Sequence, residues 1–63
     1  MDLLEAVKKA AEFLNAAGYS DYKLIEATEQ NGKWTLNFKT PEGRITLHVD
    51  PQGKINWFNL SKP

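Results

Sequence analysis

Residues 22–50 read YKLIEATEQ NG KWTLNFKT PEG RITLHVD, and this stretch decides the class of fold. Segments 33–40 and 44–50 alternate apolar and polar side chains with a period of two, as in strands with one buried and one wet face. Asn31-Gly32 is the strongest short hairpin signal, because a type I′ turn needs positive φ at both central positions. The stretch therefore predicts three antiparallel strands, over 22–30, 33–40 and 44–50.

A fourth strand is predicted over 54–60. Segments 41–43 and 51–53 both read Pro-x-Gly, in which proline presets φ for a type I turn and glycine accepts the closing left-handed position. Residues 41–47 also match residues 51–57 at an offset of ten. An offset this short indicates two successive hairpins of similar design rather than a solenoid repeat.

A helix is predicted over 2–17, on the amino-terminal side of these strands. Apolar residues recur there at three- and four-residue spacing and form one continuous sector, opposite a charged one. Asp2 is a candidate N-cap with Glu5 three residues later, and Gly18 is placed to end the helix.

These elements predict one α+β domain over residues 1–63, in which the helix covers one face of a four-stranded antiparallel meander sheet. The core expected from the alternation is Leu3, Val7, Ala11, Leu14, Ile25, Trp34, Leu36, Phe38, Ile45, Leu47, Val49, Ile55 and Trp57. With 63 residues the core is thin, and the absence of cysteine excludes disulfides as a source of stability.

In the two outer strands the apolar residues do not all fall on one face. Alternation places Tyr22 and Leu24 on one face of the first strand, and Ile25 and Ala27 on the other. In the last strand it places Ile55 and Trp57 on one face, and Phe58 and Leu60 on the other. Either a bulge switches the face within each strand, or large apolar groups lie on the open face. The match of residues 41–47 with residues 51–57 favours Ile55 and Trp57 on the buried face of the sheet, with Phe58 on the open face.

Composition narrows the function classes. Eight basic and eight acidic residues give zero net charge, which argues against nucleic-acid binding and against attachment to anionic membranes. The longest apolar runs are far shorter than the roughly 20 residues that span a bilayer. The beginning of the chain, with interspersed acidic and basic residues, is not typical of a signal peptide. We expect a soluble domain, and the absence of cysteine does not indicate a compartment.

No constellation in the sequence predicts catalysis, a cofactor or a metal. His48 is the one histidine, and a stable transition-metal site needs three or four converging ligands. Neither a nucleophilic triad nor a glycine-rich phosphate loop is present, so we expect a non-enzyme. If a partner protein binds, the expected contact face is the open side of the sheet, with Thr35, Asn37, Thr46, His48 and Phe58.

The order of helix, hairpin and strand resembles a PepSY domain. The resemblance is carried by Ile25-Glu26, by Asn31-Gly32-Lys33 and by His48 to Ile55, which read HVDPQGKI. That family commonly ends in a strand reading Val-Asp, a short turn, and then Gly-Lys with an apolar residue. The turn here is tighter, and a full strand follows it. The resemblance implies a non-enzymatic module with an inhibitory or binding role.

A second interpretation is a designed or engineered scaffold without a natural function. Caps, turns and periodicity agree closely along the chain, and such agreement is a criterion for designed sequences. Either interpretation fits a monomer, although an exposed edge strand also permits a dimer.

Overall fold

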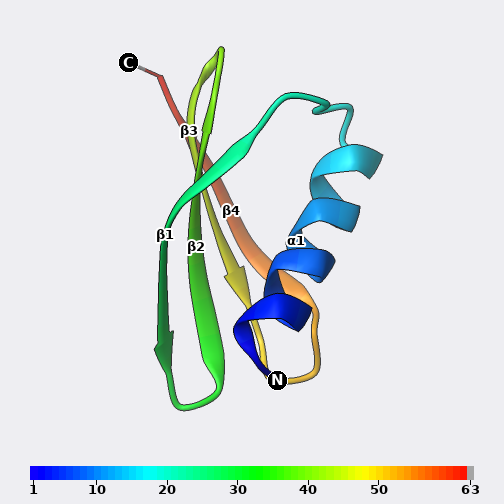
Figure 1. Cartoon of the computed structure of the whole chain (residues 1–63), viewed down its shortest axis with the longest axis vertical. Helices are drawn as coiled ribbons and strands as arrows, with labels where there is room; N and C mark the ends of the chain where they lie inside the picture. Colours follow the sequence, from blue (N-terminus) through cyan, green and yellow to red (C-terminus); the bar gives the residue numbers. More distant parts are fainter. Residues whose placement is uncertain (63) are drawn as a thin grey trace.

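The computed structural model describes residues 1–62, apart from the side chain of Trp57, and shows an α+β fold (Figure 1). Helix α1 (Leu3–Ala16) precedes four strands, β1 (Lys23–Gln30), β2 (Lys33–Thr40), β3 (Gly43–Val49) and β4 (Ile55–Ser61). The strands form one antiparallel sheet in the order β1-β2-β3-β4. The predicted architecture and meander topology are confirmed, with element ends within about one residue of those expected.

The local signals act as expected. The Asp2 carboxylate accepts a hydrogen bond from the backbone N–H of Glu5 at 2.9 Å and caps α1. At the β1–β2 turn, Asn31 and Gly32 have φ values of 55° and 80°, as a type I′ turn requires. These interactions involve residues close together in the chain, which explains why they can be read from sequence.

The core lies between α1 and the two central strands (Figure 1). α1 contributes residues at every fourth position, and β2 and β3 contribute alternate ones, as their periods require. The fully buried apolar residues are Ala6, Ala10, Leu14, Leu36, Phe38, Ile45, Leu47 and Val49. Val7, Trp34 and Ile55, which were also predicted to be core, are partly buried against this cluster, and Ala11 is partly buried as well.

Two predicted core residues are exposed instead. Leu3 retains 41% of its accessible surface at the start of α1, because the buried sector of the helix centres on Ala6 and Ala10. Ile25 retains 43%, because it is the extra residue of a bulge in β1, between the Leu24–Phe38 and Glu26–Asn37 pairs. The prediction of burial was wrong for both, and the bulge that the mixed parity allowed is present.

A second bulge turns β4. Val49 pairs with Ile55 and His48 pairs with Trp57, so Asn56 is the extra residue. Beyond it, Phe58 lies opposite Leu47 and Leu60 opposite Ile45, on the face that α1 covers. Phe58 contacts the ring of Phe13 and is 38% exposed, so the prediction that it faces outward was wrong. The prediction that Trp57 is buried concerns a side chain outside the described part of the structure.

Two contacts tie the ends of α1 to the sheet. The hydroxyl of Tyr22 donates to Asn15 Oδ1 at 2.8 Å, and its ring meets Phe38 edge-on at 5.7 Å. At the other end, the indole N–H of Trp34 donates to the carbonyl of Met1 at 3.1 Å. Within the described residues, α1 is too short and too polar to cross a membrane.

Candidate functional site

Four of the five predicted contact residues come together on the open face of the sheet. Thr35 pairs with His48 and Asn37 pairs with Thr46, in adjacent rungs of β2 and β3. All four are half-buried and point away from the helix, because they alternate with core residues. Phe58 does not belong to this group, since it lies on the helix side. We call these four residues the polar patch.

One end of the polar patch opens into a hollow. Thr35 and His48 line a surface hollow of about 410 Å³, together with Gln30, Asn31, Lys33 and Pro51. The Pro51 ring lies close to Gly32, so the β1–β2 and β3–β4 turns meet at this end of the sheet. The hollow offers amide, hydroxyl, imidazole and ammonium groups, which suit hydrogen bonding to a polar ligand.

A polar atom within the patch has no partner among the described residues. Asn37 Oδ1 is buried and accepts no hydrogen bond, although the residue faces the open side of the sheet. A buried acceptor without a donor costs about 1–3 kcal/mol relative to a satisfied one. The centre of the polar patch therefore has spare capacity to accept a hydrogen bond.

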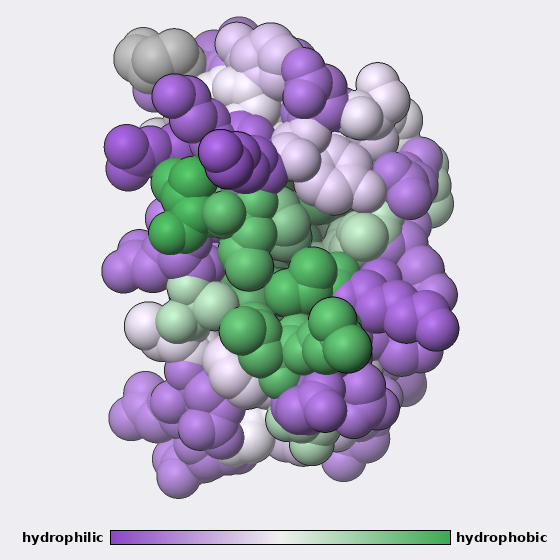
Figure 2. Space-filling view, viewed as in Figure 1, coloured by the Kyte–Doolittle hydropathy of each residue, from purple (hydrophilic) through white to green (hydrophobic). Residues whose placement is uncertain are grey.

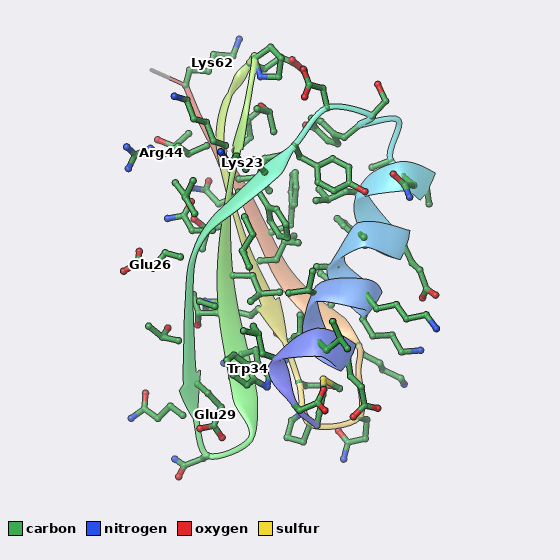
Figure 3. All side chains as sticks on the ribbon, in the orientation of Figure 1. Lys23, Glu26, Glu29, Trp34, Arg44 and Lys62 are labelled. Atoms are coloured by element: carbon green, nitrogen blue, oxygen red, sulfur yellow. The ribbon has the colours of Figure 1, made fainter. Side chains whose placement is uncertain are left out.

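The other end of the open face carries a row of cations. Lys23 pairs with Lys39, Lys39 pairs with Arg44, and Arg44 pairs with Ser61, so three positive side chains lie side by side across β1, β2 and β3. All are exposed, and Lys62 follows Ser61 at the same end (Figure 3). We call Lys23, Lys39, Arg44 and Lys62 the basic row. It holds four of the eight basic residues of the chain.

The basic row borders a second hollow. Lys39, Arg44, Ser61 and Lys62 line a hollow of about 540 Å³, together with part of the β2–β3 turn. The buried Thr40 hydroxyl donates to the carbonyl of Gly43 and accepts from the backbone N–H groups of Glu42 and Gly43. These hydrogen bonds hold the turn between Lys39 and Arg44, and Thr40, Pro41 and Gly43 of this turn line the hollow.

A third surface is apolar and lies between α1 and β1. Figure 2 shows a contiguous hydrophobic area where these two elements face one another across the side of the molecule. Each of the two elements carries an exposed large apolar residue, Leu4 at 79% in α1 and Ile25 at 43% in β1. The area exists because α1 packs over β2, β3 and β4 and leaves the inner side of β1 less covered.

The acidic side chains are dispersed over the surface. Seven of the eight Asp and Glu residues are exposed, and the eighth, Asp50, is half-buried. The Asp50 carboxylate accepts from the backbone N–H groups of Gln52 and Lys54 at 3.0 and 2.8 Å, and so closes the β3–β4 turn. Among the described residues, no three of His, Asp and Glu are grouped closely enough to hold a metal ion.

Comparisons of the chain with protein-family models, with curated proteins and with solved structures gave no match. The polar patch was predicted from strand alternation, whereas the basic row was not. Lys39 and Arg44 have the parity of the open face in the sequence, which was a usable signal for two of its members. Lys23 lies sixteen residues before Lys39, so only the pairing of β1 with β2 reveals that the two are neighbours.

Proposed function

We propose that this domain is a non-catalytic binding module that engages a protein partner through the open face of its sheet. One observation carries the proposal. The uncovered face is hollowed at both ends, and the half-buried polar patch lies between the two hollows. Half-buried Thr and Asn side chains offer hydrogen-bonding groups at a low cost of ordering, because packing already restricts their rotamers.

The roles of the acidic residues support a binding function over catalysis. Asp2 caps α1, Glu29 accepts from the backbone N–H of Gly32, and Asp50 closes a turn, so these three carboxylates serve the fold. General acid–base catalysis needs carboxyl or imidazole groups that converge in a cleft. The exposed carboxylates are instead spread over the helix, the turns and β1.

A regulatory role of the PepSY type fits this proposal. The resemblance rests largely on the segment from His48 to Ile55, which forms the end of β3, the β3–β4 turn and the first residue of β4. The Asp50 carboxylate accepts hydrogen bonds from the backbone N–H groups of Gln52 and Lys54. The geometry of this turn accounts for the Asp-x-x-Gly-Lys spacing. His48 and Pro51 of this segment also line the smaller hollow, so the same stretch would supply part of the binding face.

In this proposal the domain acts as a monomer. β1 and β4 are the edges of the sheet, and each contains a bulge, at Ile25 and at Asn56. Bulged edges twist away from a flat pairing geometry and resist addition of another strand.

The test is site-specific photo-crosslinking in cells that produce the domain. A photoreactive phenylalanine analogue at Thr46, in the centre of the polar patch, should give a discrete adduct with one protein. The same analogue at Glu12, on the exposed face of α1, is the matched control and should give none. A Thr46→Arg substitution should prevent capture by an analogue placed at Thr35, which lies on the facing strand in the adjacent rung.

Two results would contradict the proposal. One is equal adduct formation from Glu12 and Thr46, which would indicate random collision. The other is capture only from position Leu4, which would move the partner to the apolar area between α1 and β1. Circular dichroism of each variant establishes that the fold is retained.

The second interpretation is a scaffold without a partner. This interpretation is favoured by local residues that suit the structures they form: Asp2 in the cap of α1, Asn31-Gly32 in the β1–β2 turn and Asp50 in the β3–β4 turn. A guanidinium unfolding midpoint above about 5 M would support this interpretation, because natural domains seldom carry such a surplus of stability. The exposed Leu4, the unpartnered Asn37 Oδ1 and the like-charged rungs of the basic row are features that design normally avoids.

A further inference from the structure

We propose that the basic row binds an acidic segment of a protein partner, a stretch of consecutive Asp or Glu residues lying across the end of the open face. This inference rests on the proposed binding function and names the chemistry of the partner. It starts from the register, which places Lys23, Lys39 and Arg44 in successive strands of the sheet.

The first argument is the internal cost of the row. Residues directly opposite one another in an antiparallel pair have Cβ atoms about 5 Å apart, and like charges at this distance destabilise the pair. The row contains two such pairs, Lys23–Lys39 and Lys39–Arg44, in a chain whose net charge is zero. The repulsion is therefore local, and a bound anion relieves it.

The second argument is the shape beside the row. The hollow of about 540 Å³ takes three of its lining residues, Lys39, Arg44 and Lys62, from the basic row. Ser61 adds a hydroxyl, and the Arg44 guanidinium presents a planar fork that matches a carboxylate. The hydrogen bonds of Thr40 hold the backbone of the β2–β3 turn, which lies between Lys39 and Arg44.

The third argument is spacing. Lys23 and Arg44 lie on either side of Lys39 in the row, two strand spacings apart, which is about 10 Å. Alternate residues of an extended peptide are about 7 Å apart on one side. Carboxylates at alternate positions of such a peptide therefore lie within reach of neighbouring cations in the row, since the Lys side chains are long and mobile.

The surroundings favour carboxylates over nucleic acid. Sites for single-stranded nucleic acid combine cations with aromatic side chains on which bases stack. Among the described side chains, the basic row and the residues lining its hollow are Lys, Arg, Ser, Thr, Pro and Gly. Toward the middle of the sheet, the next rung holds Glu26, Asn37, Thr46 and Asn59, and its amide and hydroxyl side chains suit the polar backbone of a peptide.

The experiment is a titration of the isotope-labelled domain with a capped hexaglutamate peptide, followed by amide chemical shifts. We expect the largest shifts at Lys23, Lys39, Arg44 and Lys62, and weaker binding as the ionic strength rises from about 0.02 to 0.5 M. Lys39→Gln combined with Arg44→Gln should weaken binding about ten-fold. Lys8→Gln combined with Lys9→Gln removes the same charge from the exposed face of α1 and should change affinity less than about two-fold.

Four outcomes would overturn the inference: equal weakening by both double variants, no binding at low salt, an affinity for the peptide no higher than for inorganic phosphate, and tighter binding of an oligothymidylate. Glu26→Gln is a further check, because removal of this carboxylate beside the row should strengthen peptide binding.

The proposed function is tested separately by crosslinking at Thr46. If capture from Thr46 persists while the hexaglutamate result is negative, the binding function stands and only the acidic partner is wrong.

Discussion

The rings of Phe13 in α1 and Phe58 in β4 lie 5.5 Å apart between centroids, with their planes tilted by 52°. Tyr19, just beyond the helix, adds a second ring at 6.4 Å from Phe58. This cluster ties the helix to an edge strand of the sheet. It exists because the extra residue at Asn56 turns Phe58 toward the helix, opposite Leu47.

The aromatic pair should contribute to stability. Phe58→Ala should lower the free energy of unfolding by about 1–3 kcal/mol, less than for a fully buried ring because Phe58 is 38% exposed. A double-mutant cycle with Phe13→Ala should show a coupling of about 0.5–1.5 kcal/mol. Guanidinium unfolding of the four proteins measures both quantities. A coupling of zero would show that the rings do not interact in solution.

The register of β4 should be required for folding. Insertion of one serine after Asn56 would shift the following residues by one position and move Phe58 and Leu60 to the open face, because side chains alternate along a strand. We expect loss of cooperative unfolding and of dispersed amide shifts. Asn56→Ser keeps the length of the strand and is the control. An insertion variant as stable as this control would contradict the observed register.

Gly43 should tolerate no side chain. Its φ is 144°, and a Cβ at this position would lie 2.4 Å from the backbone oxygen of Ser61. Gly18 also has a positive φ, of 97°, but a Cβ there would meet no atom within 4 Å. Gly18→Ala should therefore cost about 1 kcal/mol from strain alone, whereas Gly43→Ala should cost distinctly more, because β4 must also move. Equal losses in thermal or denaturant unfolding would argue against the close approach of Gly43 and Ser61.

Burial should separate the effects of two leucine substitutions, one in β3 and one in α1. Leu47 is fully buried, and Leu47→Ala should cost about 2–5 kcal/mol. Leu4 lies in the apolar sector expected for the helix but is 79% exposed, so Leu4→Ala should change stability by no more than about 0.5 kcal/mol. Unfolding midpoints of the two variants measure the difference. A large loss for Leu4→Ala would place this residue in the core after all.

Asn37 should be replaceable without loss of stability. Asn37→Thr removes the buried, unpartnered oxygen and introduces a residue that suits a strand. We expect unchanged stability or a gain of about 1 kcal/mol. Thr46→Asn, the reverse exchange on the adjacent strand, provides the comparison. If Asn37→Thr destabilises the domain by more than about 1 kcal/mol, the Asn37 side chain has a structural role in solution.

Most of the fold and part of the site were predictable from particular residues. Asn31-Gly32 and the alternation from Lys33 to Asp50 predicted the central hairpins, and the same alternation placed Thr35, Asn37, Thr46 and His48 on one face. Phe58 was misplaced because the match of residues 41–47 with residues 51–57 suggested that both strands alternate in the same way. A bulge is present in β4, within residues 51–57, and changes the face of the residues after it. Ile25 was misplaced because the apolar pattern of β1 does not show which of its residues is the extra one of the bulge.

The sequence by itself determined the element order, the caps of α1, the type of the β1–β2 turn and the buried face of β2 and β3. These features depend on residues within one turn or one strand, where φ preferences and periodicity act directly. The tertiary structure alone decided where the outer strands change face, how far α1 covers β1, and which charges become neighbours across strands. Those outcomes depend on pairing between residues far apart in the chain, and a shift of one residue in that pairing moves every later side chain to the other face.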